Sequence, residues 1–380
     1  MNNGVTKLSK RIKVMTIFGT RPEAIKMAPL VLELNKRSDE FESIVTVTAQ
    51  HREMLDQVLD IFNITPDYDL NIMKKQQSLA QITTRALERL DEVMKETKPD
   101  IVLVHGDTST TFTGSLAAYY NQIAVGHVEA GLRTWDKYSP FPEEMNRQLT
   151  GVIADLHFSP TEKAKQNLLD ENKAADRIIV TGNTAIDALK TTVDEAYSSP
   201  IIDALGDNRL VLMTAHRREN LGGNMQQMFR AIKRLVETHK DIQVIYPVHL
   251  NPVVQQTAKE ILGNDDRIQL IEPLDVVDFH NFAAHAHLIL TDSGGVQEEA
   301  PSLGVPVLVL RDTTERPEGI DAGTLKLAGT DEDTIFNLAN ELLSDGKAHM
   351  KMAKASNPYG DGEASRRIAD AIVDYFEQNN

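Results

Sequence analysis

The sequence IKVMTIFGTRPEAIK at residues 12–26 decides the fold class of this chain. Its first seven residues, 12–18, form a short, β-branched and mostly apolar run that is typical of a buried parallel strand. Gly19 then allows a tight turn, and Pro22 suits the first turn of a helix. A strand that runs through a glycine turn directly into a helix is the unit from which α/β proteins are built.

The same alternation of strand-like and helical patterns continues along the 380 residues. Apolar residues recur at helical spacing in segments such as 79–94 and 225–236, where core packing explains them. Further short strand-like runs lie at residues 43–48, 101–104, 124–128, 177–181, 210–214, 243–246, 268–271, 288–291 and 305–310. So many strands in alternation with helices suit two doubly wound parallel sheets better than one. We therefore expect an α/β fold with two Rossmann-like domains.

The expected domain boundary lies near Gly182-Asn183, directly after a strand-like run. Residues 1–182 are expected to form an N-terminal domain and residues 183–360 a C-terminal domain. A helix predicted at about residues 364–376 follows the turn-rich segment NPYGDG at 357–362. Such a break lets the C-terminal segment 361–380 cross back onto the first domain.

Charge and composition disfavour several classes of function. The chain has 40 Lys and Arg against 56 Asp and Glu, a net charge of −16, which disfavours non-specific binding to nucleic acid or to an anionic membrane. Cysteine is absent, so disulfides, thiolate nucleophiles and cysteine-based metal sites are excluded. No apolar run approaches the ~18 residues of a membrane span, and the polar residues 1–11 are unlike a signal peptide. We therefore expect a cytoplasmic protein that does not associate with a membrane.

Two predicted strand-to-helix turns have the composition of phosphate-binding turns. They combine basic side chains with backbone N–H groups that glycine leaves accessible, and one adds a carboxylate suited to a ribose diol. The residues are Arg21 and Lys26 in the first turn, Ser293, Gly294, Gly295 and Glu299 in the second, and Arg316 as a further phosphate partner. One such turn in each predicted domain suggests a diphosphate or nucleotide in the cleft between the domains. The alternative is a pair of ordinary capped turns with solvated side chains.

Ionisable residues follow several of the predicted strands. Asp107 and Glu129 end two consecutive strands, Glu143 follows in SPFPEE at 139–144, and His216 ends a strand of the second domain. Carboxylates that cluster in a cleft push their pKa values apart, which can leave one as a base and another as an acid. Each carboxylate alone is equally compatible with a helix cap or a solvated loop.

Other cofactor classes lack their sequence signals. The pairs His285 with His287 and His127 with Glu129 have neither a third ligand nor zincin spacing, so we expect no metal. There is no P-loop run, and no Gly-x-Gly-x-x-Gly follows a strand, which disfavours a P-loop nucleotidase and NAD binding. We expect no cofactor.

Beyond the first eleven residues, the chain resembles the non-hydrolysing UDP-N-acetylglucosamine 2-epimerases. The runs that carry the resemblance are residues 18–30, 104–107, 127–133, 139–147, 214–219 and 291–317. The resemblance implies a glycosyltransferase B arrangement of the two domains with the active site in the interdomain cleft, and a homodimer. It also implies interconversion of UDP-N-acetylglucosamine with UDP-N-acetylmannosamine, supplying cell-wall or surface polysaccharide synthesis.

The resemblance also implies roles for particular residues. Asp107, Glu129 and Glu143 resemble the catalytic carboxylates of the family, and His216 resembles its catalytic-site histidine near the diphosphate. The turn residues given above, Arg21, Lys26, Ser293, Gly294, Gly295, Glu299 and Arg316, resemble its nucleotide contacts. Some bacterial members are activated by UDP-N-acetylglucosamine at a second site, which Gln50, Arg217 and His249 match and from which Glu53 and Gln76 depart.

Three other functions are compatible with the same pattern. A glycosyltransferase of this architecture would use the UDP pocket but require an acceptor. A hydrolysing epimerase would release free N-acetylmannosamine and UDP. A non-catalytic UDP-sugar sensor would need the nucleotide turns but not the three carboxylates.

Overall fold

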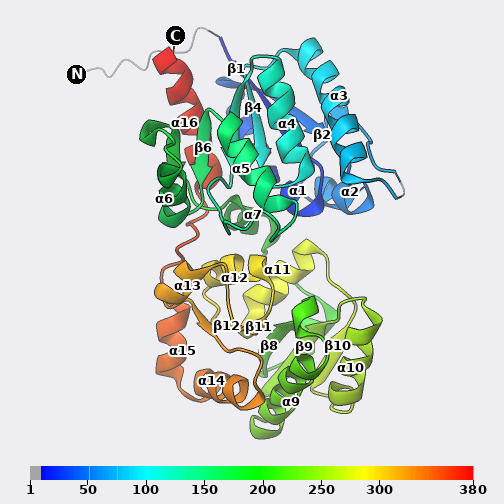
Figure 1. Ribbon diagram of the computed structural model, residues 1–380. Helices are drawn as coiled ribbons and strands as arrows, with labels where there is room; N and C mark the ends of the chain where they lie inside the picture. Colours follow the sequence, from blue (N-terminus) through cyan, green and yellow to red (C-terminus); the bar gives the residue numbers. More distant parts are fainter. Residues whose placement is uncertain (1–9, 51, 75, 380) are drawn as a thin grey trace, which may run out of the picture. The chain divides into compact units, whose positions relative to one another are not determined.

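The computed structural model describes residues 10–50, 52–74 and 76–379, drawn in colour in Figure 1. Most of the polar segment 1–11, on which the expectation of no signal peptide rests, lies outside the described residues. The chain divides into two compact units. The first runs to Ala188 and takes up the chain again from Gly360, and the second comprises Leu189–Tyr359. No helix in the described part of the chain is long and apolar enough to cross a membrane.

The first unit is built on a seven-stranded parallel sheet with the order β3-β2-β1-β4-β5-β6-β7. The strands are β1 (Ile12–Phe18), β2 (Phe41–Val47), β3 (Tyr68–Asp69), β4 (Ile101–His105), β5 (Ala124–Val128), β6 (Leu156–Ser159) and β7 (Ile178–Val180). The helices are α1 (Arg21–Lys36), α2 (Arg52–Ile61), α3 (Leu79–Thr97), α4 (Ser109–Tyr120), α5 (Glu143–Ile153), α6 (Glu162–Asp170) and α16 (Ala364–Asn379), and the boundary between the units falls within α7 (Thr184–Thr192). The C-terminal helix α16 packs against α1, and Arg37 and Asp370 form an ion pair of 2.6 Å there.

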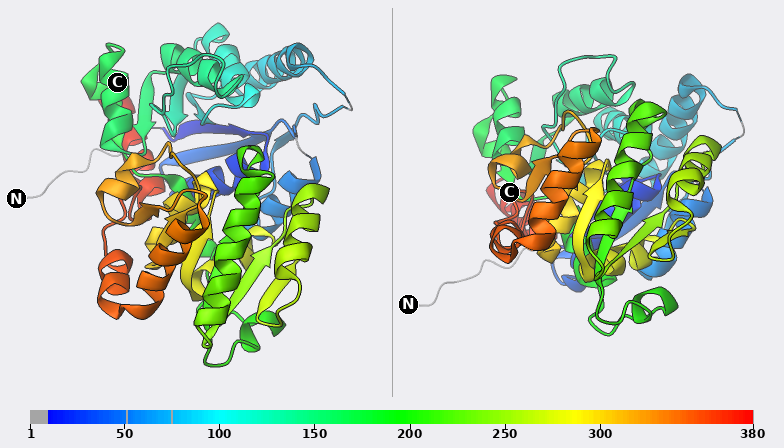
Figure 2. Two further views of the ribbon diagram at one scale, coloured as in Figure 1. Left: turned by 60° about the horizontal axis from the view of Figure 1, so that its bottom comes forward. Right: turned by 90° about the horizontal axis from the view of Figure 1, so that it is seen from below.

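The second unit has a six-stranded parallel sheet with the order β10-β9-β8-β11-β12-β13. Its strands are β8 (Arg209–Thr214), β9 (Ile242–Pro247), β10 (Ile268–Ile271), β11 (Ala286–Thr291), β12 (Val307–Val309) and β13 (Leu325–Leu327). Its helices are α8 (Pro200–Asp203), α9 (Gly223–Thr238), α10 (Pro252–Leu262), α11 (Val276–His285), α12 (Gly294–Glu299), α13 (Pro317–Asp321), α14 (Glu332–Ser344) and α15 (Gly346–Ala353). Figure 2 shows α9 and α14 side by side against this sheet. Two parallel sheets with alternating helices confirm the expected α/β fold with two Rossmann-like domains.

Both faces of each sheet are buried, as the apolar strands require. Along β1, Val14 and Phe18 join one hydrophobic cluster, whereas Met15 and Ile17 join another. Successive side chains of a strand point to opposite faces, so these clusters are the cores on the two sides of the sheet.

The first strand-to-helix turn shows why the opening stretch folds as it does. Thr20 caps α1 by accepting a hydrogen bond from the backbone N–H of Glu23, whose own carboxylate accepts one from the N–H of Thr20 at 2.8 Å. This reciprocal pair satisfies two N–H groups that a helix start otherwise leaves without partners. Any Cβ at Gly19 would lie 1.9 Å from Thr48 Oγ1, so the turn requires glycine.

The strand orders also determine where ligands are expected. In the first sheet the chain reverses its direction of winding between β1 and β4, and in the second between β8 and β11. Ligands of open α/β sheets bind beyond the carboxyl ends of the strands at such switch points. Most of the candidate residues follow β1, β4 and β5 in the first unit and β8 and β11 in the second, whereas Gln50, His249 and Arg316 follow β2, β9 and β12.

Candidate active site

Glu129 follows β5 in the first unit, and its carboxylate lies near three side chains. Lys26 of α1 forms an ion pair with its carboxylate, and Asn183 donates from Nδ2 to Glu129 Oε2 at 3.0 Å. His105, at the end of β4, places Nε2 3.7 Å from the same oxygen. Glu129 has a φ of 62°, a backbone conformation that a residue with a side chain adopts only under local constraint. A carboxylate of the first unit therefore lies beside a lysine and a histidine.

His105 is buried, and this decides its charge. Burial lowers the pKa of its imidazole to about 4, although the nearby Glu129 carboxylate acts in the opposite direction. The ring is therefore neutral at pH 7. Lys26 is the cation that balances the Glu129 carboxylate in this group.

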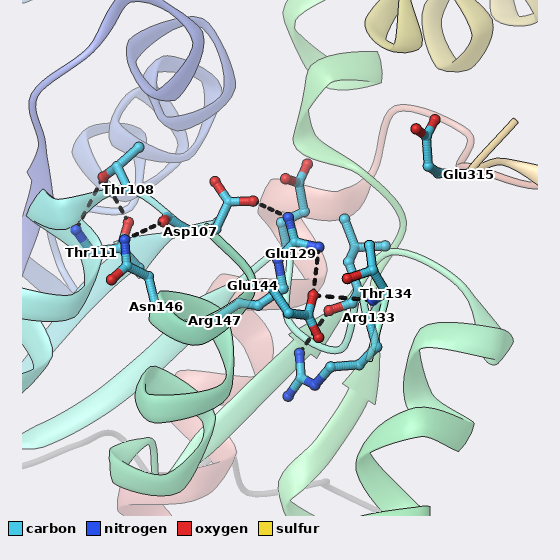
Figure 3. A network of polar contacts seen from close by, with 12 residues as sticks. Asp107, Thr108, Thr111, Glu129, Arg133, Thr134, Glu144, Asn146, Arg147 and Glu315 are labelled. Carbon is cyan, nitrogen blue, oxygen red and sulfur yellow. Dashed lines mark hydrogen bonds and ion pairs between the residues drawn. The ribbon is translucent and has the colours of Figure 1, made fainter. Parts of the chain in front are cut away.

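Asp107 follows β4 and is held by α5. Arg147 forms an ion pair with its carboxylate, and Asn146 donates from Nδ2 to the backbone oxygen of Asp107 at 2.9 Å. Arg147 also places Nη1 3.4 Å from Glu144 Oε2, so it bridges two carboxylates (Figure 3). The guanidinium fixes the direction of the Asp107 side chain.

Glu143 and Glu144 are neighbours in sequence with different surroundings. Glu144 is fully buried and accepts hydrogen bonds from the backbone N–H groups of Thr134 at 3.0 Å and Trp135 at 3.1 Å. Burial acts to raise its pKa, but these hydrogen bonds, the one from Gln148 and the charge of Arg147 outweigh it and hold the pKa below the ordinary value. Glu143, partly exposed in the first turn of α5, has no hydrogen bond or ion pair within the described residues. Glu144 thus anchors the loop, and Glu143 is available for chemistry.

The remaining candidates of the first unit lie around the start of α1. Arg21 is the first residue of α1, is partly exposed, and has no ion pair with any described residue. Gln50 accepts a hydrogen bond of 3.4 Å from Thr110 Oγ1, and Thr110 in turn contacts Thr48.

In the second unit, His216 follows β8 and contacts a buried carboxylate. Its Nδ1 lies 3.2 Å from Oδ1 of Asp292, the residue that follows β11. Asp292 Oδ2 accepts from the backbone N–H groups of His216 and Arg217, both at 2.9 Å. The His216 ring also stacks on His249, with ring centroids 5.7 Å apart. The candidate catalytic histidine therefore lies beside the two residues of this unit, Arg217 and His249, that match the activator site.

The glycine turn after Asp292 contacts Arg316. A Cβ at Gly294 would lie 2.8 Å from Arg316 Nη1, so this arginine packs directly on the glycine backbone. Arg316 is held there by the largely buried Glu298, which accepts from Nε at 2.6 Å. The next residue, Glu299, has Oε2 3.4 Å from Nε2 of the buried His280. Gly294 thus lies directly against Arg316, and Glu299 lies beside Gly295 and His280.

Within the described residues, no group of three or more His, Asp or Glu side chains is placed to hold a metal ion. His285 is engaged at Nδ1 with the backbone oxygen of Asn281 at 2.8 Å. His287 stacks on His349 with centroids 3.9 Å apart. Both contacts match the interpretation of these histidines as packing residues.

Several residues of the site were not predicted from the sequence. Asn183, Arg147 and Asp292 each contact a candidate residue; Arg147 and Asp292 lie in recognised motifs, whereas Asn183 lies at the expected domain boundary. The signal available for Asp292 was its position directly before the glycine turn. No local pattern shows that its side chain reaches back to His216, since 76 residues separate them.

The fold and the polar strand ends define the class of this protein, an α/β enzyme with two Rossmann-like domains of the glycosyltransferase B type. A model of the UDP-N-acetylglucosamine 2-epimerase family matches residues 33–373. The chain is 70% identical over 367 residues to the UDP-N-acetylglucosamine 2-epimerase of Bacillus subtilis (strain 168), covering 97% of this chain and 96% of that protein. The chain therefore belongs to the UDP-N-acetylglucosamine 2-epimerase family and is an isomerase, as the resemblance of its motifs predicted.

Solved structures agree with this family. A crystal structure of a putative UDP-N-acetylglucosamine 2-epimerase from Listeria monocytogenes has 62% identity and a TM-score of 0.94, with 98% of each chain covered. The UDP-GlcNAc 2-epimerase from Neisseria meningitidis, solved bound to UDP-GlcNAc, has 49% identity and a TM-score of 0.85, covering 96% of this chain and 100% of that chain.

Proposed function

We propose that this chain interconverts UDP-N-acetylglucosamine and UDP-N-acetylmannosamine by eliminating UDP and adding it back. The observation that carries the proposal is the pair of strand-end carboxylates, Asp107 and Glu129, each held by a cation of the same unit. The relative from Neisseria meningitidis, whose structure has UDP-GlcNAc bound, supports the choice of substrate.

The chemistry explains why such groups are needed. The C2 hydrogen of the sugar has no neighbouring carbonyl, so direct removal of this proton is very hard. When UDP departs from C1, positive charge develops at C1 and acidifies the C2–H bond. A base then removes the proton and leaves 2-acetamidoglucal and UDP. Protonation of the opposite face of C2 and return of UDP to C1 give the epimer, with no net change in atoms or electrons.

The proposed roles follow from this sequence of steps. Cations hold the departing diphosphate, whose charge grows in the transition state. We assign this role and the nucleotide contacts to Arg21, Lys26, Ser293, Gly294, Gly295, Glu299 and Arg316, and we assign His216 as the catalytic-site histidine near the diphosphate. Opposite faces of C2 require two acid–base groups, which we assign to the set Asp107, Glu129 and Glu143.

Further parts of the proposal rest on the family. The enzyme acts as a homodimer and supplies precursors for cell-wall or surface polysaccharide. Gln50, Arg217 and His249 form an activating site for UDP-N-acetylglucosamine. The stacking of His249 on His216 supports a link between this site and the catalytic histidine.

Isotope exchange tests the proposal. The chain is incubated with UDP-N-acetylglucosamine in heavy water without an acceptor, and the products are followed by proton NMR. We expect deuterium at C2 of both UDP-sugars and an equilibrium mixture of the two epimers. No deuterium at C2 would overturn the mechanism and favour a glycosyltransferase or a sensor, and free N-acetylmannosamine would indicate a hydrolysing enzyme.

A further inference from the structure

We infer that Asp292 is a positioning residue that holds the His216 imidazole with Nδ1–H toward its carboxylate and Nε2 toward the reacting diphosphate. The inference rests on the proposed function only for the role of His216 in the reaction. The arrangement of the two side chains can be tested without any turnover.

Asp292 is buried and is the anchor of the loop after β8. Its Oδ2 accepts from the N–H groups of His216 and Arg217, and from Asn220 Nδ2 at 3.1 Å. Its backbone oxygen accepts from Arg217 Nε at 3.0 Å, and its backbone N–H donates to Thr214 at 3.1 Å. The loop that carries His216 is therefore fixed to the end of β11.

The second carboxylate oxygen is directed at the imidazole. His216 Nδ1 lies 3.2 Å from Asp292 Oδ1, and this oxygen has no other hydrogen-bond partner within the described residues. A carboxylate only accepts hydrogen bonds, so the proton of a neutral His216 ring belongs on Nδ1. Burial acts to raise the pKa of Asp292, but the His216 side chain and the N–H groups of the loop outweigh it and hold the pKa below the ordinary value.

The opposite edge of the His216 ring, which carries Nε2, is accessible to a ligand. The His216 side chain is 43% exposed, and its Nε2 has no partner among the residues described. The stacked His249 covers one face of the ring without engaging this nitrogen. With Nδ1 directed at the Asp292 carboxylate, Nε2 is the nitrogen that can face the departing diphosphate.

Substitution of Asp292 by asparagine separates orientation from anchoring. In Asp292→Asn the amide oxygen can still accept from the loop N–H groups, because these donors all converge on one oxygen. The amide NH₂ then faces Nδ1 and can only donate, which moves the ring proton to Nε2. Asn220→Ala is the matched control, since it removes one donor to the carboxylate without touching the imidazole.

The first measurement is the tautomer of His216 by ¹⁵N NMR at pH 8, with the signal assigned by its loss in His216→Gln. We expect the Nδ1–H form in the wild-type chain and in Asn220→Ala, and the Nε2–H form in Asp292→Asn. A wild-type ring with the proton mainly on Nε2, or no change of tautomer in Asp292→Asn, would overturn the inference. The tautomer of His216 in the wild-type chain tests the inference even if Asp292→Asn fails to fold.

The second measurement is turnover of UDP-N-acetylglucosamine in a double-mutant cycle. We expect Asp292→Asn to lower kcat at least ~10-fold with KM changed less than ~3-fold, because the defect is in orientation rather than in substrate binding. In the His216→Gln background the same change should lower kcat no more than ~2-fold, because Asp292 acts through His216. Independent losses that multiply would indicate a structural role and refute the inference. If the tautomer changes as expected but the wild-type chain has no epimerase activity, the proposed function fails and the positioning by Asp292 stands.

Discussion

Lys26 and Glu129 form a largely buried ion pair that joins helix α1 to the end of strand β5, although 103 residues separate them in the sequence. Their side chains are 17% and 10% exposed, so water screens the two charges little. Strand β4 lies between β1 and β5 in the sheet and adds His105 to the same group. The pair thus connects a proposed diphosphate contact with a proposed acid–base group.

The buried pair predicts a coupled effect on stability. Lys26→Met leaves the Glu129 carboxylate buried without its cation and is expected to lower the free energy of unfolding by about 1–3 kcal/mol. The double variant Lys26→Met/Glu129→Gln removes both charges and should recover part of this loss. Urea denaturation of the wild type, both single variants and the double variant measures the coupling. Strictly additive changes would show that the pair does not interact.

The three carboxylates are expected to control turnover rather than nucleotide binding. Asp107→Asn, Glu129→Gln and Glu143→Gln should each lower kcat at least ~100-fold, because each removes a group that transfers a proton or positions one. Titration calorimetry with UDP should still detect binding. Near-normal rates in all three variants would refute the assignment.

The adjacent Glu143 and Glu144 should respond differently to the same substitution. Glu144→Gln replaces a buried carboxylate that accepts hydrogen bonds from Thr134, Trp135 and Gln148, and is expected to lower the free energy of unfolding by about 1–3 kcal/mol. Glu143→Gln, at a partly exposed position, should leave stability within about 0.5 kcal/mol while turnover falls. Thermal unfolding and initial rates of both variants make the comparison. If Glu143→Gln lowered stability and Glu144→Gln lowered turnover alone, Glu143 would be the structural residue and Glu144 the reactive one.

Gly294 is predicted to set the position of Arg316. In Gly294→Ala the new Cβ would lie 2.8 Å from Arg316 Nη1 and displace the guanidinium. We expect the affinity for UDP to fall about tenfold, or about 1.4 kcal/mol. Gly223→Ala is the control, because a Cβ there has open space around it. Equal affinities of the two variants would argue against a role of Arg316 in binding.

Buried histidines make the first unit sensitive to acid. Burial, with smaller effects of Lys173 and Arg133, lowers the pKa of His157 to about 4, against about 6.5 in an unfolded chain. Between these values the unfolded state binds the extra proton, so the free energy of unfolding falls as the pH is lowered from 6.5 toward 4. In His157→Gln the slope of this free energy against pH near pH 5 should be smaller by about 1 kcal/mol per pH unit. Equal slopes in chemical denaturation series would show that His157 is not held neutral.

The alternation of strands and helices could be predicted because it depends on patterns among residues that are close together in the sequence. Apolar runs such as 12–18 and turns such as that at Gly19 depend on near neighbours in the chain. Three strands were not predicted, namely β3 (Tyr68–Asp69), β6 (Leu156–Ser159) and β13 (Leu325–Leu327). Each has between two and four residues, although β7, β10 and β12 are as short and were predicted, so length alone does not explain the omission. Their pairing depends on the sheet that the longer strands provide.

By itself, the sequence determined the fold class, the strand-end positions of Asp107, Glu129 and His216, and the family to which the chain belongs. Only the tertiary structure decided the partners of these residues, Lys26 and Asn183 for Glu129, Arg147 for Asp107, and Asp292 for His216. The reason is physical. Turn chemistry and periodicity act over a few residues, whereas an ion pair between distant segments depends on the order in which parallel strands assemble.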